Sequence, residues 1–291
     1  MIIRLLILAT LVLPLANSVE AESASNLRTD KLAGNVKIVR TEETWTTKNV
    51  ESRHVLMTVE TYDQKGNKTE WDGYMGSGKP LRSLFAYDDN GNVTEEIWYD
   101  SADQLKGKST YTYDAKGNLV EEISSNGIRV VYSYDSHNNK TLQRVFDVVK
   151  DEGPRRFGPV EKTVRYSYDK GNHLTQVASY DPRDSRVWNP ELQAHRILYT
   201  YDGKGQTTSQ TVFNADNTLR TKTRYVYDSW GRIAKEFLFT SKNGITHAYR
   251  YTYRIDANGN WITQTKSKHV VSNGQLKYVP VETIYRSFEY Y

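Results

Sequence analysis

The chain has 291 residues and a formal net charge of +4, from 39 basic and 35 acidic residues, and its mean hydropathy is −0.71. It contains 22 Tyr and no Cys, so neither a disulfide framework nor a lipid-modified N-terminal Cys can form. The small net charge predicts weak attraction to anionic polymers. Because the basic residues are scattered along the expected strands, we predict no nucleic-acid surface.

The N-terminus has the charge and length of a secretory signal peptide. Met1-Ile2-Ile3-Arg4 precedes an apolar run from Leu5 to Ala16, and Val19-Glu20-Ala21 offers a small-residue cleavage site. An uncleaved membrane anchor is the alternative, but twelve apolar residues are too few to span a bilayer. We therefore expect a secreted or periplasmic bacterial protein that does not span the membrane after cleavage. The predicted segments are a signal peptide (1–21), a flexible lead (22–34) and a β domain (35–291).

Two strands are expected before the repeated part of the chain. The first covers Val36 to Arg40 and Glu43 to Thr46, and the second runs from His54 to Tyr62. From Tyr62 onward one local unit recurs, and it is clearest at Tyr111-Thr112-Tyr113-Asp114-Ala115-Lys116-Gly117-Asn118-Leu119. A repeat of this length predicts one continuous domain rather than two.

Each copy of the unit contains an Asp followed three residues later by Gly or Asn. Asp can accept a hydrogen bond from the amide two residues on, and Gly or Asn tolerates the positive φ that closes a bulged hairpin. Each copy is therefore predicted to be a β-hairpin. The eight pairs are Asp63 and Gly66, Asp88 and Gly91, Asp114 and Gly117, Asp135 and Asn138, Asp169 and Asn172, Asp202 and Gly205, Asp228 and Gly231, and Asp256 and Gly259.

Aromatic residues form two columns just before these Asp residues. The columns are two residues apart, so they lie on the same face of a strand, and we expect them to stack across neighbouring copies. The residue before the Asp is Tyr62, Tyr87, Tyr113, Tyr134, Tyr168, Tyr201, Tyr227 or Ile255. Two residues earlier stand Glu60, Phe85, Tyr111, Tyr132, Tyr166, Tyr199, Tyr225 and Tyr253.

The predicted fold is all-β: a single curved or partly wrapped antiparallel sheet of consecutive hairpins. The count is about eighteen strands, more than a strongly twisted sheet carries without curling, and full closure of the sheet is left open. If all repeat turns lie on one edge, every connection of variable length lies on the opposite edge. Binding loops are expected on that second edge.

The Tyr-x-Tyr-Asp-x-x-Gly-x-Leu pattern at 111–119 resembles the YD-repeat family, which includes the bacterial Rhs proteins, the shell subunits of insecticidal toxin complexes and the teneurins. The resemblance covers roughly residues 55–291 and implies the repeat fold. It does not imply one function, because members of the family use the repeat for different tasks.

Motifs that could carry chemistry each lack a required part. Gly73 to Pro80 approaches a phosphate-binding loop, but Pro80 has no hydroxyl to hold magnesium and no helix is expected to follow. Asp88 to Asn92 and Asp256 to Asn260 resemble calcium-loop fragments without the completing Glu. Glu95-Glu96 and Glu121-Glu122 are interpreted as solvated strand charges.

The six His residues have no metal-ligand spacing. We predict no metal, no nucleotide, no cofactor and no enzyme activity. Catalytic residues that converge from distant loops remain the alternative.

Two long loops carry the residues that we single out for ligand binding. Trp188 lies in a polar loop and could serve as a platform for a sugar ring or a protein partner, or fold back over the sheet. The other Trp residues, Trp45, Trp71, Trp98, Trp230 and Trp261, are interpreted as core or edge packing. The tentative ligand-binding residues are Trp188, Arg186, Arg183, Arg155 and Arg156.

These observations predict an exported, non-catalytic repeat protein that acts as a binding or scaffold module for an unknown envelope or extracellular protein. One alternative is a carbohydrate-binding protein whose partner is an envelope or surface polysaccharide. A second alternative is an accessory or remnant of a Rhs-type toxin system. Eight repeats are too few to enclose a cargo domain, and the Asp-Pro-x-Gly-Leu signature of toxin-bearing members is absent.

Overall fold

The computed structural model describes residues 32–47, 50–74, 78–149, 156–180, 195–240, 244–272 and 275–291. Every regular element in these ranges is a β-strand, which confirms the all-β prediction. No helix among these residues is long and apolar enough to cross a membrane. The strands are β1 (Val36–Thr47), β2 (Val50–Glu51), β3 (Val55–Tyr62), β4 (Lys68–Gly73), β5 (Leu81–Tyr87), β6 (Val93–Tyr99), β7 (Leu105–Tyr113), β8 (Leu119–Ser124), β9 (Ile128–Tyr134), β10 (Lys140–Val149), β11 (Arg156–Tyr168), β12 (Leu174–Tyr180), β13 (His195–Tyr201), β14 (Thr207–Phe213), β15 (Leu219–Tyr227), β16 (Ile233–Thr240), β17 (Gly244–Ile255), β18 (Trp261–Ser272) and β19 (Gln275–Tyr290).

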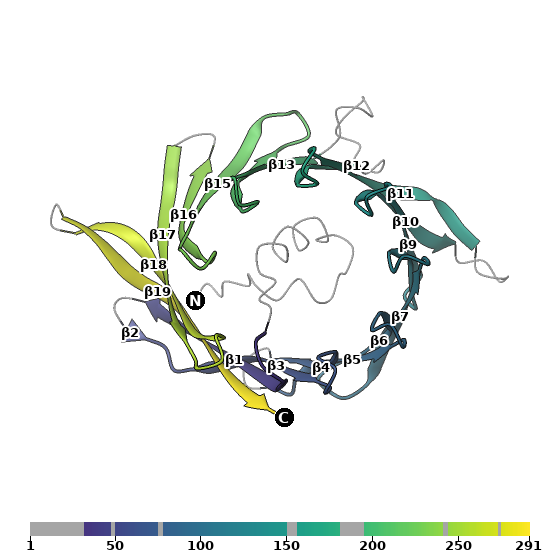
Figure 1. The fold of residues 1–291 in the computed structure, drawn as a ribbon, viewed down its shortest axis with the longest axis horizontal. Coiled ribbons are helices and arrows are strands. Elements are labelled where there is room, and N and C mark those ends of the chain that lie inside the picture. The colour runs from purple at the N-terminus through teal and green to yellow at the C-terminus, as the bar shows by residue number, and fades with distance from the viewer. Residues whose placement is uncertain are drawn as a thin grey trace.

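The sheet closes on itself. All nineteen strands belong to one sheet, and the two-residue strand β2 pairs only with β1. The other eighteen strands form a ring, because β1 pairs antiparallel with β3 on one side and with β19 on the other. Figure 1 shows this ring end-on, with the last strands beside the first. Closure removes the two exposed edges that an open sheet would present to other chains.

The closed sheet has two different rims. Consecutive strands are antiparallel, so the repeat turns, which begin at 63–67 and end at 256–260, all lie at one end of the ring, here named the turn rim. The remaining connections leave the strands at the opposite end, named the variable rim. The connection from β8 to β9 takes only three residues, whereas the one from Tyr180 to His195 spans fourteen intervening positions.

A bulge at nearly every repeat turn explains why so long a sheet curls. The pairing register shifts beside the residue that precedes the Asp, for example between Thr112 and Tyr113 and between Ser167 and Tyr168. Each bulge adds one residue to a strand, bends it and increases its twist. Repeating the bulge from hairpin to hairpin bends the sheet in a consistent direction, and this favours closure.

The tyrosine columns lie on the inside of the ring. Figure 1 shows the repeat turns within the circle drawn by the strands. The rings of the tyrosines contact these turns, as when the imidazole of His173 stacks on Tyr201 with the ring centres 4.9 Å apart. The inward face that carries the tyrosine columns is named the tyrosine face. It also holds the buried cluster of Val164, Tyr166, Val177, Ile197 and Tyr199 on β11 to β13.

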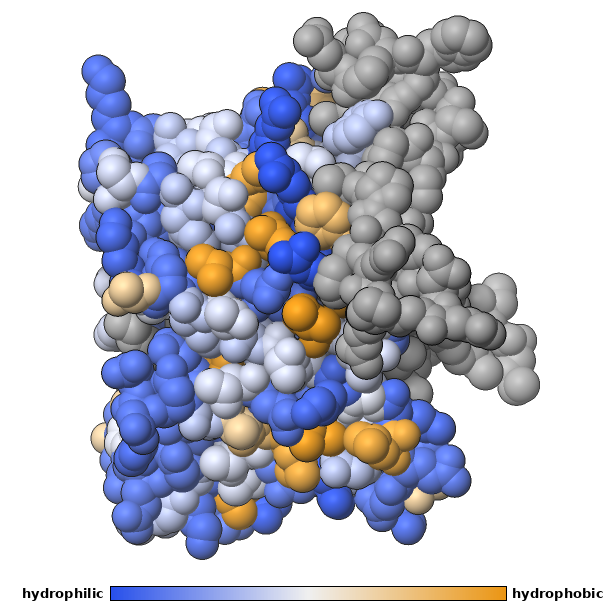
Figure 2. Space-filling view, turned by 90° about the vertical axis from the view of Figure 1, so that its right-hand side faces the viewer, coloured by the Kyte–Doolittle hydropathy of each residue, from blue (hydrophilic) through white to orange (hydrophobic). Residues whose placement is uncertain are grey.

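The outward face is more polar. Figure 2 shows it on the side of β6 to β11, where hydrophilic residues predominate and apolar residues form small groups between them. Outward charges on these strands are paired across the sheet: Lys108 bonds Glu95 at 2.6 Å and Arg129 bonds Glu121 at 2.6 Å. Among the described residues, no second layer packs on the outside of these strands.

Candidate functional site

The turn rim is built from eight copies of one hydrogen-bonded loop. In each copy the Asp Oδ1 accepts hydrogen bonds from the amides two and four residues on, at 2.8 to 3.0 Å. The residue three positions on has a positive φ in every copy, from +62° at Asn172 to +94° at Gly259. The Asp carboxylate thus accepts hydrogen bonds from two backbone amides of its own turn.

Two connections on the variable rim close with the same backbone hydrogen bonds and the same positive φ. Asp100 accepts hydrogen bonds from the amides of Ala102 and Gln104, and Asp103 has a φ of +58°. Asn217 likewise has a φ of +61° in the turn that begins at Asn214. We did not predict these two turns: the first has Tyr99 before its Asp but carries Asp103 where the repeat has Gly or Asn, and the second begins with Asn214 in place of Asp.

Tyrosine hydroxyls tie each hairpin to the preceding one. Tyr113 Oη donates to the carbonyl of Val93 at 2.9 Å, where the strand after the previous turn begins. Six further hydroxyls do the same at the corresponding carbonyl. These are Tyr87 to Lys68, Tyr134 to Leu119, Tyr168 to Lys140, Tyr201 to Leu174, Tyr227 to Thr207, and Tyr253 to Ile233. The tyrosine columns therefore bind one repeat to the next by hydrogen bonds as well as by packing.

A second column on the tyrosine face was missed by the sequence analysis. Eight residues after the repeat Asp, six of the eight copies carry Glu or Gln, and these side chains hydrogen-bond a tyrosine hydroxyl on the paired or neighbouring strand. We name this set the Glu/Gln belt. It consists of Glu96 with Tyr111, Glu122 with Tyr132, Gln143 with Tyr166, Gln210 with Tyr225, Glu236 with Tyr251, and Gln264 with Tyr253.

The interpretation of Glu96 and Glu122 as solvated strand charges was wrong. Their neighbours Glu95 and Glu121 face outward and pair with cations, but Glu96 and Glu122 face inward toward Tyr111. Burial raises the pKa of Glu122, and the nearby Glu96 carboxylate adds to this shift. Burial and the two carboxylates likewise raise the pKa of Tyr111. Extending the alignment eight residues past each Asp would have revealed the column.

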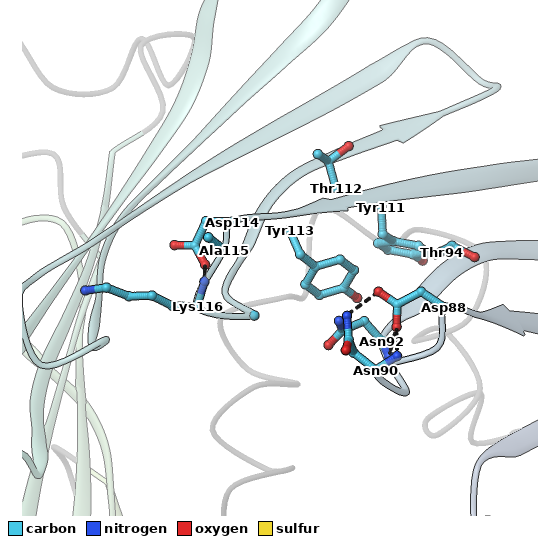
Figure 3. A pocket seen from close by; sticks show the side chains of 11 residues that line it. Asp88, Asn90, Asn92, Thr94, Tyr111, Thr112, Tyr113, Asp114, Ala115 and Lys116 are labelled. Carbon is cyan, nitrogen blue, oxygen red and sulfur yellow. Dashed lines mark hydrogen bonds between the residues drawn. The ribbon is translucent and has the colours of Figure 1, made fainter.

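Figure 3 shows a pocket between two successive repeat turns on the tyrosine face, with a volume of about 660 Å³. Tyr113 points across it toward Asp88 and Asn92 of the preceding turn. Both Asp88 oxygens already accept hydrogen bonds: Oδ1 from the amides of Asn90 and Asn92, and Oδ2 from the Asn92 side chain. These bonds lower the pKa of Asp88, with the Asn92 side chain contributing most. The Asp88 carboxylate is therefore already engaged within its own turn.

No group of three or more metal-ligating side chains occurs among the residues that the structure describes. The Asp256 turn uses its carboxylate in the same way as the Asp88 turn, since Oδ1 accepts from the amides of Asn258 and Asn260. The chemistry of the repeat Asp residues is therefore that of a turn. Oδ1 accepts from two backbone amides of the turn, and the spacing of Asp and Gly that this turn requires explains why the sequence resembles calcium-loop fragments.

The ring is sealed at the turn rim by Asn260 and the final two tyrosines. Asn260 is 5% exposed; its Oδ1 accepts from the amide of Ala33 at 2.7 Å and its Nδ2 donates to the Ala33 carbonyl at 2.8 Å. Tyr290 Oη donates to Asp256 Oδ2 at 2.8 Å. Tyr291 Oη donates to the Tyr62 carbonyl at 2.5 Å, so the end of β19 reaches across β1 to β3.

The tentative ligand-binding residues are largely outside the described part of the chain. Trp188, Arg186, Arg183 and Arg155 lie outside the described residues. Arg156 is the first residue of β11, and its side chain is not described. Both segments join strands at the variable rim, on either side of β11 and β12.

The interpretation of Trp230 as core or edge packing was wrong. It is the third residue of the turn at 228–232, and 78% of its surface is exposed. The Arg232 guanidinium lies 4.8 Å from the Trp230 ring centre and 4.8 Å from that of Tyr253, and it is bonded to Asp228. Trp230 is therefore an exposed aromatic side chain on the turn rim, in contact with Arg232.

A single closed antiparallel sheet of repeated hairpins defines a shell-type repeat protein. The family model described as teneurin YD-shell matches residues 20–176. This match covers more than half of the 291 residues, so the chain belongs to the teneurin YD-shell family. A comparison with curated proteins finds no match.

Several solved structures are similar to this chain. A porin-like protein from Bacteroides uniformis is 12% identical with a TM-score of 0.45, over 89% of this chain and 98% of that one. The TcdB2-TccC3-Cdc42 structure is 15% identical with a TM-score of 0.29, over 83% of this chain but only 15% of that chain. A Photorhabdus luminescens Tc holotoxin pore is 12% identical with a TM-score of 0.20, over 76% and 16% of the two chains.

Proposed function

We propose that this YD-shell protein is exported and acts as a non-catalytic binding or scaffold module for a protein of the cell envelope or the extracellular space. The observation that carries the proposal is the difference between the two rims. The turn rim repeats one hydrogen-bonded loop, whereas the variable rim collects all the connections that differ in length. Loops that vary in length on a rigid scaffold are the usual place for recognition.

The use of the carboxylates supports a non-catalytic role. General acid-base chemistry needs a carboxyl group that can reach a substrate. The repeat Asp residues accept backbone hydrogen bonds within their own turns, and Glu96 and Glu122 of the belt are bonded to tyrosine hydroxyls. In the described part of the sheet these groups hold the shell together.

Export is inferred from the N-terminal sequence, which lies outside the described residues. The positive charge at Arg4, the apolar run to Ala16 and the small residue Ala21 fit a cleaved signal peptide. The chain has no Cys, so its folding does not depend on the redox state of the compartment. The closed sheet leaves no free edge strand. Both features suit an exported protein. We therefore place the working protein in the periplasm or outside the cell.

The test is capture of a partner on the immobilised chain from detergent-solubilised envelope and from secreted proteins, with Trp188→Ala as the variant and Trp230→Ala as the matched control. Both variants remove one Trp, but at opposite rims. We expect a discrete protein to bind the wild type and Trp230→Ala, and to bind Trp188→Ala at least several-fold less. Equal capture by both variants, or no protein captured by the wild type, would overturn the assignment to the variable rim.

The same variants address carbohydrate binding, the alternative that Trp188 and the neighbouring Arg residues suggest. Protease-treated envelopes keep their polysaccharide and lose their proteins. Retention of the chain on treated envelopes, lost in Trp188→Ala and kept in Trp230→Ala, would replace the protein partner by a glycan.

A further inference from the structure

Three basic residues lie together on the tyrosine face near the variable rim, on the neighbouring strands β17 and β18 (Figure 1). Lys268 of β18 is directly opposite Tyr249 of β17, and Lys266 is directly opposite Tyr251. Directly opposed residues share a face of the sheet, so both lysines face inward. His247 is on the same face, two residues before Tyr249. We name His247, Lys266 and Lys268 the inner basic cluster.

Tyrosine rings hold this cluster in place. The ammonium of Lys266 lies 4.3 Å from the ring centre of Tyr249 and 5.7 Å from that of Tyr251. The imidazole of His247 stacks on Tyr249, with the ring centres 5.9 Å apart and the ring planes 10° from parallel. An ammonium has three N–H donors, and contact with a ring face leaves donors for an acceptor. Lys266 is therefore positioned by the rings and still able to donate hydrogen bonds.

The carboxylates on the neighbouring strands do not neutralise the two lysines. Glu236 of β16 is directly opposite Tyr249, but its carboxylate accepts a hydrogen bond from Tyr251 Oη at 2.5 Å. Glu282 of β19 is directly opposite Lys266. Neither lysine forms an ion pair with a carboxylate of the described chain, and both are half-buried. Two positive charges thus lie in a partly desolvated place without a counter-charge.

His247 responds to the positive potential of this cluster. Its pKa is lowered, first by burial and then by the charges of Lys268 and Lys266. Its Nδ1 is buried and has no hydrogen-bond partner among the described residues, so no acceptor there favours the protonated ring. An anion bound beside the lysines would offset their charges and allow the imidazole to take up a proton.

We propose that the inner basic cluster binds a divalent tetrahedral oxyanion, phosphate or sulfate, just inside the variable rim. Lys266 and Lys268 are two residues apart on one strand face, about 6.6 to 7 Å, so both ammonium groups can reach a single small anion. Lysine is a common ligand of phosphate in proteins. A single carboxylate would neutralise only one of the two charges, whereas a divalent anion neutralises both. The site is on the wall of the ring and does not rest on the partner assigned to the variable loops.

The test is the titration of His247, followed by NMR of its ring protons in sodium sulfate and in sodium chloride of equal ionic strength. His247→Gln identifies its signal. We expect sulfate to raise the pKa of His247 relative to chloride, because a bound anion favours the protonated ring. The signal of His137, which is exposed in a repeat turn, should titrate alike in both salts.

Lys268→Gln is the decisive variant because, unlike Lys266, Lys268 has no ring packed on it in the described chain. It should raise the pKa of His247 in chloride and weaken sulfate binding about tenfold, which corresponds to about 1.4 kcal/mol. Lys268→Arg keeps the charge and should bind sulfate. Lys235→Gln is the matched control, since it removes one positive charge from the outward face of β16. No effect of sulfate on wild-type His247, or an undiminished effect in Lys268→Gln, would overturn the proposal.

Two phosphates separate the possible sources of the oxyanion. Inorganic phosphate is the free ion, and glycerol 2-phosphate carries the same group as an ester; near pH 8 both are largely divalent. Shifts of the His247 signal by both compounds would mean that the group can belong to a larger ligand that enters the ring. A shift by inorganic phosphate alone would mean that the free ion is the ligand. If neither compound moves the signal, the proposal is wrong for phosphate.

Discussion

Gly117 illustrates how much one residue contributes through its backbone conformation alone. It has a φ of +83°, and a Cβ added there would meet no atom within 4 Å. Any cost of substitution is therefore conformational. We expect Gly117→Val to lower the free energy of unfolding by about 1 to 3 kcal/mol, because a β-branched residue is strained in the left-handed region. Urea denaturation monitored by Tyr and Trp fluorescence measures this difference.

Gly117→Asn is the control for this prediction. Asn138 and Asn172 occupy the same place in two other repeats, with φ of +63° and +62°. Asn tolerates this conformation, so the control should cost well under half as much as Gly117→Val. Equal melting of Gly117→Val and the wild type would contradict the conformational argument.

The stability of the folded chain is expected to depend on pH through Glu122. Burial raises its pKa in the folded state, so its stabilising contribution is complete below the unfolded value and is lost as the pH rises through the folded value. Glu122→Gln removes the buried charge and keeps a group that can accept from Tyr132. We expect the variant to be more stable than the wild type at pH 7 and indistinguishable near pH 4.

The neighbouring residue gives the control for this pH effect. Glu121 faces outward and its carboxylate bonds Arg129 at 2.6 Å, so Glu121→Gln should stabilise the chain at neither pH. Thermal melting across pH 4 to 8 measures both variants. A pH profile for Glu122→Gln that runs parallel to the wild type would show that Glu122 is not the titrating group.

At the scale of the strand, the Glu/Gln belt couples neighbouring hairpins. Gln143 is 3% exposed, and its side-chain oxygen accepts from Tyr166 Oη at 2.8 Å across the β10–β11 pair. We expect Gln143→Val and Tyr166→Phe each to cost about 1 to 3 kcal/mol, because each leaves a buried polar group without this partner. The double variant should cost less than the sum, and chemical denaturation of the four proteins measures the coupling.

Two repeats have an apolar residue where the others carry the Glu or Gln of the belt: Trp71 and Val177. Val177 occupies the position eight residues after Asp169 and is 3% exposed in the buried cluster of β11 to β13. The position therefore accepts Val when its surroundings are apolar. If the stability costs of Gln143→Val and Tyr166→Phe add in full in the double variant, the two side chains act independently.

The local part of each hairpin could be predicted from the sequence because its causes are local. The Asp carboxylate and the residue with positive φ act within five positions, so their spacing is visible in the chain. The Glu/Gln belt has the same period, but its tyrosine partners are on other strands, as with Glu96 and Tyr111. Trp230 has no local signal, since the sequence does not show which side chains pack against a turn residue.

For the whole molecule, the seam at the turn rim decides whether the ring stays closed. Asn260 makes two hydrogen bonds to the backbone of Ala33 and one to Tyr290 Oη, while the equivalent Asn92 bonds only within its own turn. We expect Asn260→Ala to cost about 1 to 3 kcal/mol and to speed amide hydrogen exchange in β1 and β19 selectively. Hydrogen exchange followed by mass spectrometry measures it.

Asn92→Ala is the control for the seam, because it removes the same side chain from the same place in a hairpin within the wall. It should cost less and change exchange only near its own turn. Uniform acceleration across the sheet in Asn260→Ala would mean that the seam is no weaker than any other strand pair.

The sequence by itself determined the repeat, the turn at each Asp, the strand face that carries the tyrosines and the curled antiparallel sheet, since each rests on contacts within one hairpin. The tertiary structure decided three further things: closure through β1 and β19, the pairing of buried Glu and Gln with tyrosine hydroxyls, and the gathering of the inner basic cluster on β17 and β18. Closure depends on bend summed over eighteen strands. The other two depend on register between strands, which no single hairpin encodes.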